Sequence, residues 1–395
     1  MKNILILGGD GYLGWPTAIF FSSKGYNVTV VDNYFRRNAC ENLSLRPLYK
    51  IPNLINRCQE WKKKSGKIIK VILGDLTDPE LMRSLFQKKT ITSWPEESCI
   101  DNKPDTIVHF AEQPSAPYSM TNYKNANFTI SNNLLVTNNL MYAVKDFSPH
   151  SHIIKLGTMG EYGTPNIDIE EGWIDINHNG RNEKFLFPRQ ASSIYHTSKI
   201  MDTDLLWFGV RAWKLKVTDL MQGPVYGFTT KEIKNNEKLY TIFNYDEIFG
   251  TIINRFVTQA VVGYPLTVFG KGEQKRGYIN INDTIQCIDK SFSNPAKNGE
   301  LRIFNQITQT FSVNQLAEMI YEVGRELNYD VSIKNIPNPR IENEDHYYNP
   351  KYQGLKDIGV KATLLNKDIL KDFFIHVEKY KNNIDRDIIF KGIKW

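Results

Sequence analysis

One segment near the N-terminus constrains the fold more than any other. A short apolar run at 4–7 is followed at once by Gly8, Gly11 and Gly14, in a GxxGxxG spacing. An amphipathic stretch and a second apolar run come next, and Asp32 ends that second run. This order predicts a strand, a tight turn, a helix and a second strand. We therefore predict an α/β protein with a Rossmann-type, doubly wound parallel sheet.

The same segment has the chemistry of a dinucleotide-binding site. Gly8 permits the tight turn, Gly11 lets a pyrophosphate approach the backbone, and Gly14 lets helix and strand pack closely. The helix N-terminus then offers unpaired N–H groups to the phosphates. Asp32 lies 18 residues after Gly14 and is placed to accept hydrogen bonds from an adenosine ribose diol. This favours NAD over NADP. Arg36 and Arg37 follow Asp32 closely and weaken the preference.

The rest of the chain continues the α/β pattern. Strand-like apolar runs alternate with longer helical patterns, at 68–73, 106–110, 152–156 and 216–220. Such alternation predicts a parallel sheet with helices on both faces. Two long helices are expected at 122–144 and 192–213, and both are long enough to pack against the same helices of a second copy. A homodimer is therefore expected.

Beyond residue 222 the pattern becomes irregular, which predicts a second unit. We expect a NAD-binding Rossmann domain of residues 1–222 and 275–310, and a smaller mixed α/β substrate domain of 223–274 and 311–395. Between the two long helices, Asn179-Gly180 separates two alternating runs and predicts a β-hairpin. The hairpin is either a lid over the active site or a solvated surface hairpin.

Composition limits the class of partner and the compartment. Lys and Arg exceed Asp and Glu by 49 − 43 = 6, which is too mild for nucleic acid and suits an anionic small substrate. The four cysteines form no CxxC pair, so neither a zinc ribbon nor a redox motif is expected. No run approaches 18 apolar residues, and no signal-peptide pattern precedes the first strand. These features predict a reduced, cytoplasmic protein without a membrane span.

A tyrosine and a lysine carry the expected chemistry. Tyr195 and Lys199 are four residues apart and share one face of the expected helix. The lysine ammonium is expected to lower the tyrosine pKa, and a tyrosinate can remove a hydroxyl proton as hydride leaves for the cofactor. Thr158 ends the fifth expected strand, from which its hydroxyl would complete the proton path to the substrate.

These features together resemble the extended short-chain dehydrogenases/reductases, which mostly act on nucleotide sugars. The segment 222–227 resembles the Asn/Gln-x-x-Tyr-Gly pattern of that family, and 270–276 resembles its G-x-G-x-x-x-R pattern. The resemblance implies that Arg276 binds a diphosphate, a task that suits the bidentate fork of a guanidinium.

Longer runs resemble one branch of that family, the UDP-sulfoquinovose synthases. They lie at 115–120, 157–172, 250–251 with 254–256, 337–340 and 344–349, so the resemblance covers nearly the whole chain. It implies that NAD-dependent oxidation at C4 of UDP-glucose is followed by elimination across C5 and C6. Sulfite then adds at C6 and C4 is reduced. The implied partners are UDP-glucose, sulfite and a second copy of the chain, and a protein that donates sulfite is a further candidate partner.

The motifs and the resemblance together predict three sets of site residues. The catalytic set is Thr158, Tyr195, Lys199, Glu161 and His196. The cofactor-binding set is Gly8, Gly11, Tyr12, Leu13, Gly14, Asp32, Asn33, Arg36, Asp75, Leu76, Gln113, Tyr195, Lys199 and Val225. The substrate-binding set is Thr158, Gln222, Thr251, Arg255, Thr267, Arg276 and Arg340. No metal site is expected.

Two departures from related patterns shape these expectations. The 4,6-dehydratases carry Asp-Glu after the strand-five threonine, whereas this chain has Met159 and Gly160. A plain dehydratase is therefore disfavoured, and Glu161 and His196 become candidates for the acid/base work at C5 and C6. In the sulfoquinovose synthases an arginine follows the glutamine after strand four, and here that position is Pro114. No replacement for that cation can be identified from the sequence.

The motifs leave two other functions open. A UDP-glucose 4-epimerase, or another NAD-dependent enzyme that modifies UDP-sugars, would need the same motifs without the acid/base groups at C6. A non-catalytic regulator that binds NAD or a nucleotide sugar is disfavoured, because such a protein would be expected to lose Tyr195 or Lys199, and both are present.

Overall fold

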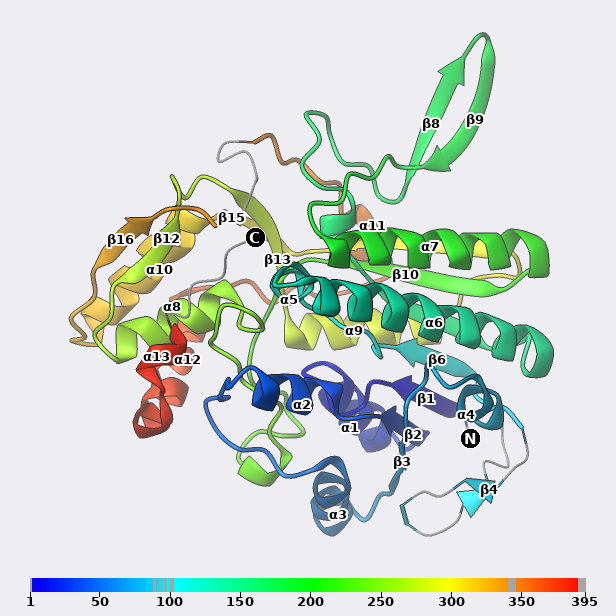
Figure 1. The fold of residues 1–395 in the computed structure, drawn as a ribbon, viewed down its shortest axis with the longest axis horizontal. Coiled ribbons are helices and arrows are strands. Elements are labelled where there is room, and N and C mark those ends of the chain that lie inside the picture. Colours follow the sequence, from blue (N-terminus) through cyan, green and yellow to red (C-terminus); the bar gives the residue numbers. More distant parts are fainter. Residues whose placement is uncertain are drawn as a thin grey trace.

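A seven-stranded parallel sheet forms the centre of the molecule (Figure 1). The computed structural model describes residues 2–87, 90–91, 94–95, 98–99, 103–339 and 346–389. The strand order is β14-β10-β7-β6-β1-β2-β3, and every neighbouring pair is parallel. The strands are β1 (Asn3–Leu7), β2 (Asn27–Asp32), β3 (Ile69–Leu73), β6 (Thr106–His109), β7 (His152–Thr158), β10 (Lys216–Gln222) and β14 (Glu300–Gln306). The predicted fold class is confirmed.

Helices cover both faces of this sheet, which is why its strands read as continuous apolar runs. Ile4 and Ile6 pack on one face with α1 (Gly14–Ser23), α3 (Leu54–Ser65) and α9 (Ile281–Ser293). Leu5 and Leu7 pack on the other face with α4 (Pro79–Ser84), α6 (Tyr123–Phe147) and α7 (Ile194–Trp213). The two long helices expected from the sequence are thus α6 and α7. Among the described residues, no helix is long and apolar enough to cross a bilayer.

A second core lies beside the sheet. It joins α8 (Ile252–Val261), β12 (Leu266–Phe269), α10 (Val313–Glu326) and α12 (Lys367–Lys379). The mostly exposed strand β16 (Ile333–Ile336) pairs with β12 in parallel. Side chains between Cys40 and Tyr49 also pack into this core, although they precede residue 222. The proposed division into two domains stays a prediction.

The remaining elements are α2 (Phe35–Asn42), β4 (Thr90–Ile91), β5 (Ser98–Cys99), α5 (Ala116–Met120), η1 (Met159–Glu161), β11 (Val225–Tyr226), η2 (Glu237–Leu239), β13 (Lys275–Asn280), β15 (Gln309–Ser312), α11 (Gln353–Asp357), η3 (Lys381–Asn383) and α13 (Arg386–Ile389).

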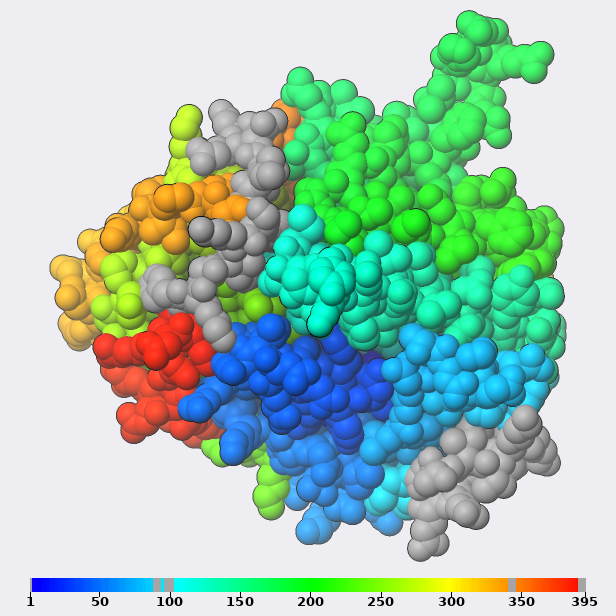
Figure 2. Space-filling model, in the orientation of Figure 1, coloured from blue at the N-terminus to red at the C-terminus, as the bar shows by residue number. Residues whose placement is uncertain are grey.

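The predicted hairpin is present and stands away from the body of the molecule (Figures 1 and 2). Its strands are β8 (Trp173–His178) and β9 (Arg181–Leu186). Asn179 and Gly180 connect them with φ values of 51° and 75°, which is the backbone that an Asn-Gly hairpin turn requires. Most of the hairpin is exposed, so the structure favours the surface hairpin over the lid.

Candidate active site

A cavity of about 610 Å³ opens at the carboxyl ends of the strands, where ligands collect in open α/β sheets. It brings together nearly all of the residues predicted from the sequence, from the glycine turn after β1 to Arg276 on β13. Three predicted residues, Gln113, Glu161 and Lys199, are buried and do not line the cavity. Arg340 lies outside the described residues.

The glycine turn leaves no room for side chains. A Cβ atom at Gly14 would lie 2.0 Å from the carbonyl oxygen of Gly8. A Cβ atom at Gly8, whose φ is +89°, would lie 2.7 Å from the carbonyl carbon of Phe110. The turn therefore packs directly under the start of α1 and leaves its backbone facing the cavity. This arrangement fits the pyrophosphate of a dinucleotide.

Asp32 ends β2 and faces the same cavity. Its carboxylate accepts hydrogen bonds from the backbone N–H of Asp10 (2.8 Å) and of Tyr34 (2.7 Å). Burial raises the pKa of Asp32 to about 6, and the negative charge of Asp10 acts in the same direction. Asp32 is therefore placed as a charged acceptor for a ribose diol at neutral pH.

The arginine that follows Asp32 at position 37 has a partner of its own. Arg37 Nε donates to Asp10 Oδ2 at 2.7 Å, and Arg57 Nη2 donates to Asp10 Oδ1 at 2.5 Å. The guanidinium of Arg37 is thus paired with the carboxylate of Asp10. This pairing supports the preference for NAD, because a free arginine beside the ribose would favour a 2′-phosphate.

We expect Asp32→Ala to weaken NAD binding by about 10- to 100-fold, because hydrogen bonds between a carboxylate and the ribose diol are lost. In the wild-type protein, NAD affinity should fall as the pH drops through about 6, since protonation of Asp32 removes the anionic acceptor. Titration calorimetry at several pH values measures both effects. Asp289→Ala on α9 is the control. Unchanged affinity in Asp32→Ala contradicts the assigned ribose contact.

The first turn of α7 carries two cavity residues, Tyr195 and His196. Ser193 caps the helix by accepting a hydrogen bond from the backbone N–H of His196 at 3.1 Å. One turn later, the ammonium of Lys199 forms an ion pair with the carboxylate of Glu112. Burial raises the pKa of Tyr195 well above its ordinary value, and the negative charge of Glu112 adds to this. The expected lowering of the Tyr195 pKa by Lys199 stays a prediction.

The imidazole of His196 fills the space beside Gly160. A Cβ atom at Gly160 would lie 2.2 Å from His196 Nε2. A larger residue at position 160 would therefore displace the His196 ring from its present position. The other ring nitrogen, Nδ1, lies 3.1 Å from the hydroxyl oxygens of both Ser192 and Ser193. His196 therefore stands where a dehydratase side chain at position 160 would begin.

Glu161 serves the loop after β7 and does not face the cavity. Its Oε1 accepts a hydrogen bond from the backbone N–H of Thr158 at 3.2 Å, while the Thr158 hydroxyl caps η1. Burial raises the pKa of Glu161, whereas the positive charge of Lys155 opposes the rise. Because Glu161 is completely buried, it is not placed to touch a ligand. Its expected role as an acid or base has no support in this geometry.

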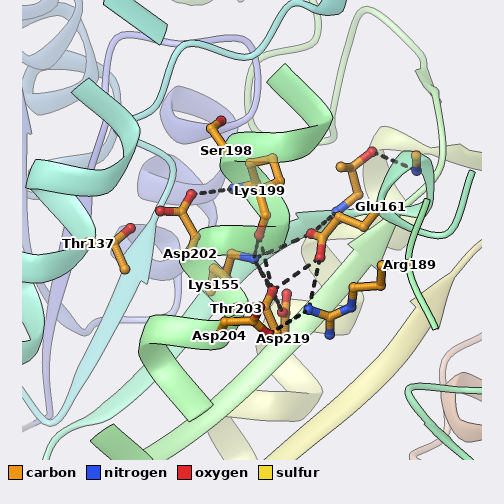
Figure 3. A network of polar contacts seen from close by, with 12 residues as sticks. Thr137, Lys155, Glu161, Arg189, Ser198, Lys199, Asp202, Thr203, Asp204 and Asp219 are labelled. Carbon is orange, nitrogen blue, oxygen red and sulfur yellow. Dashed lines mark hydrogen bonds and ion pairs between the residues drawn. The ribbon is translucent and has the colours of Figure 1, made fainter. Parts of the chain in front are cut away.

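Lys155 connects Glu161 to α7 and to β10 (Figure 3). Its Nζ donates to Thr203 Oγ1 at 2.6 Å and to the carbonyl oxygen of Lys199 at 3.2 Å. Its Nζ also lies 3.3 Å from Asp219 Oδ2 and 3.4 Å from Glu161 Oε1. This buried cluster fixes the distance between the strand that ends in Thr158 and the helix that carries Tyr195.

Part of the cavity wall carries positive charge. The arginines that line it are Arg36, Arg255 and Arg276. The Arg276 side chain donates to His346 Nε2 at 3.0 Å, and Arg255 stacks on the ring of Phe269 at 5.0 Å. Pro114 lines the cavity as well. This wall is suited to an anionic ligand such as a diphosphate.

Two residues after β6 have roles that the sequence did not reveal. Gln113 is buried and holds the following loop, donating to the carbonyl oxygen of Ser115 at 2.9 Å and to Thr129 Oγ1 at 2.8 Å. Glu112 lines the cavity and pairs with Lys199, yet it was not among the predicted site residues. The available signal was its position, because an acid at the carboxyl end of a parallel strand points toward the ligand site.

Comparison with known proteins places this geometry in context. Residues 4–305 match the model of the NAD dependent epimerase/dehydratase family. The chloroplastic UDP-sulfoquinovose synthase of Spinacia oleracea is 45% identical over 394 residues, which span 100% of this chain and 79% of the relative. The UDP-sulfoquinovose synthase of Sulfolobus acidocaldarius is 40% identical over 396 residues, spanning 100% and 97%.

A solved structure with the same fold is the UDP-glucose 4-epimerase of Bifidobacterium longum in complex with NAD+ and UDP. It has a TM-score of 0.69 and 20% identity, and the match covers 96% of this chain and 99% of that one. At this identity the likeness concerns the fold.

Proposed function

The chain belongs to the UDP-sulfoquinovose synthases, within the NAD-dependent epimerase/dehydratase family, and we propose that it converts UDP-glucose and sulfite into UDP-sulfoquinovose. The observation that carries this proposal is the identity of 45% and 40% to two such synthases over the whole chain. The cavity supports it further, because it joins a dinucleotide cradle, a Tyr–Thr pair and an arginine wall.

NAD is the cofactor, and it supplies a hydride acceptor and donor for C4 of the sugar. The glycine turn and Asp32 would hold its pyrophosphate and adenosine ribose, as their geometry fits both groups. Tyr12, Leu13, Asn33, Asp75, Leu76 and Val225 line the same part of the cavity. Lys199 is buried in α7, one turn after Tyr195, and a contact between Lys199 and the cofactor stays a prediction.

In the proposed mechanism, Tyr195 removes the proton of the C4 hydroxyl as C4 is oxidised. The hydroxyl of Thr158 orients that C4 oxygen by hydrogen bonding, from the fixed position that Glu161 gives it. Gln222, Thr251 and Thr267 line the cavity and are the proposed polar contacts to the UDP-sugar, with Arg255 and Arg276 at the diphosphate.

His196 is the proposed acid/base for the chemistry at C5 and C6. Oxidation at C4 makes the C5 proton acidic, so an imidazole can remove it. The imidazolium then donates this proton to the C6 hydroxyl, which leaves as water. The sulfur of sulfite then forms a bond to C6 while C5 regains a proton. The exchange of hydroxyl for sulfonate is complete once C4 is reduced. The position of His196 beside Gly160 favours it over Glu161 for this work.

The proposal is tested by incubating the purified protein with UDP-glucose, with and without sulfite, and measuring product masses. A sulfite-dependent product in which a sulfonate replaces one hydroxyl supports the synthase. An isomer of unchanged mass, formed equally without sulfite, supports a UDP-glucose 4-epimerase. That alternative draws weak support from the shared fold of solved epimerases.

Gly160→Ala is expected to separate the two halves of the reaction. The added Cβ atom would displace His196 Nε2, so sulfonate formation should fall by about 10²- to 10⁴-fold, the range for a lost acid/base group. Oxidation at C4, followed by the absorbance of reduced nicotinamide, should continue. Asn177→Ala on the exposed strand β8 is the control. Full sulfonate formation in Gly160→Ala would argue against His196 as the acid/base.

A homodimer through α6 and α7 is part of the proposal. Both helices lie side by side on one face of the molecule (Figures 1 and 2). They expose apolar side chains there, namely Leu135, Tyr142, Met201 and Phe208. Such side chains are typical of an interface between subunits. A sulfite-donor protein and a cytoplasmic location stay predictions.

A further inference from the structure

Two backbone donors in the first turn of α7 are bound by α5, which lies beside this helix (Figure 1). The first N–H groups of a helix have no partner within the helix. In α7 the N–H of Ile194 donates to the sulfur of Met120 at 3.5 Å, and the N–H of Tyr195 donates to Ser119 Oγ at 3.0 Å. These acceptors end α5 and lie 74 and 76 positions earlier in the chain. The turn that carries Tyr195 is therefore capped by a distant segment.

Ser119 is a fixed acceptor for the Tyr195 N–H. Its side chain is 1% exposed, and its hydroxyl donates to the carbonyl oxygen of Ala116 at 2.7 Å. Because the hydroxyl proton is directed to Ala116, a lone pair of Oγ is left for the Tyr195 N–H. Removing Oγ would leave this donor at the start of α7 without its acceptor, which is costly inside a protein.

The other end of α5 is attached to the loop before α8. Ser115 caps α5 and donates through Oγ to the carbonyl oxygen of Ile248 at 2.5 Å. The ring of Tyr118 is stacked on that of Phe249, with centroids 5.9 Å apart and planes inclined by 24°. Ile248 and Phe249 line the cavity. Helix α5 thus connects this part of the cavity wall to the turn that carries Tyr195.

We propose that Ser119 is a positioning residue for the oxidation step, and that its hydrogen bond to the Tyr195 backbone holds the phenol within reach of the C4 hydroxyl. The inference rests on the proposed function, in which Tyr195 removes that proton. Ser119 is buried and does not line the cavity, so it acts through Tyr195 and not on a ligand. A catalytic group displaced by about 1 Å loses roughly 10²-fold in rate, so this hydrogen bond has a measurable effect.

The first experiment measures the reduction of bound NAD by UDP-glucose in the absence of sulfite, using stopped-flow absorbance. Ser119→Ala should be slower than the wild type by about 10- to 100-fold. The affinities for NAD and for UDP, measured by titration calorimetry, should stay unchanged. The matched control is Ser84→Ala in α4, because Ser84 Oγ also donates to a carbonyl oxygen three positions earlier, that of Leu81, at 2.6 Å. This control should keep the wild-type rate.

A double variant shows whether Ser119 acts through Tyr195. Tyr195→Phe keeps the backbone N–H but has no phenol to misplace, so its slow residual rate should be the same in Ser119→Ala/Tyr195→Phe. A purely structural role predicts instead that a disturbed cavity slows both backgrounds equally.

Equal losses in the two backgrounds, or a wild-type rate in Ser119→Ala, overturn the proposal. Circular dichroism shows whether each variant folds. If Ser119→Ala does not fold, Ser119→Cys keeps the test decisive, because its sulfur is a weak acceptor at the same place and its rate should lie below that of the wild type.

A second measurement needs neither substrate nor turnover. Amide hydrogen exchange at the start of α7, followed by peptide mass spectrometry, should be about 10-fold faster in Ser119→Ala, because the Tyr195 N–H has lost its acceptor. In Ser84→Ala it should match the wild type. Unchanged exchange in Ser119→Ala overturns the proposal. If UDP-glucose does not reduce NAD in the wild-type protein, the proposed function fails, and this measurement still decides whether Ser119 holds the first turn of α7.

Discussion

Tyr195→Phe should abolish oxidation at C4 while leaving NAD bound. The substitution removes the phenolic hydroxyl and keeps the aromatic ring, whose centroid lies 5.2 Å from that of His196. Loss of a general base lowers a rate by about 10²- to 10⁴-fold, so reduction of the bound nicotinamide by UDP-glucose should become very slow. Stopped-flow absorbance measures the reduction, and the cofactor released on denaturation measures bound NAD.

The matched control for this variant is Tyr123→Phe. Tyr123 lies at the start of α6 and is 72% exposed, so loss of its hydroxyl should leave the reaction unchanged. A near-normal rate of nicotinamide reduction in Tyr195→Phe would show that another group removes the C4 proton. A loss of bound NAD would instead mean that the hydroxyl contributes to cofactor binding.

Lys155→Met should cause a large loss of stability. The ammonium of Lys155 contacts the carboxylates of Glu161 and Asp219, and all three side chains are completely buried. Removing the cation leaves negative charge buried without its partner, which costs about 3–5 kcal/mol. The free energy of unfolding, obtained by denaturant titration, measures the loss.

A control variant and a double variant test whether the lost stability comes from the buried ion pair. Lys24→Met removes a lysine from an exposed ion pair with Asp289, where a loss of about 0–1 kcal/mol is expected. In the double variant Lys155→Met/Asp219→Asn, one uncompensated charge is removed together with the cation. Its loss should therefore be smaller than the sum of the two single losses. Additive losses would mean that Lys155 and Asp219 do not act as a pair.

The nucleotide half of the site could be predicted because its signals are local. Gly8, Gly11, Gly14 and Asp32 all fall within one strand–turn–helix–strand unit, in which backbone geometry dictates the residue types. Six of the seven sheet strands and the long helices α6 and α7 follow from apolar periodicity in the same way, whereas β14 was not predicted. The space shared by Gly160 and His196 could not be predicted, since it depends on how α7 is placed against the loop after β7.

The charged contacts under the site were missed because they join residues that are distant in the sequence. Glu112 and Lys199 are 87 positions apart, and Lys155 and Asp219 are 64 apart. One signal was nevertheless available. Lys155 and Asp219 each interrupt an apolar run, and a charge in a strand covered on both faces needs a buried partner. β7 and β10 are neighbours in which Lys155 is paired in register with Asp219.

The order of the strands also affects how this chain folds while it is being synthesised. β14 completes the sheet next to β10, but it ends 306 − 222 = 84 residues later in the chain. At usual rates of translation, β10 therefore waits roughly 4–17 s with its outer edge unpaired. An unpaired strand edge is a template for association with other chains. A chain that ends before β14 is made would therefore keep the edge of β10 open.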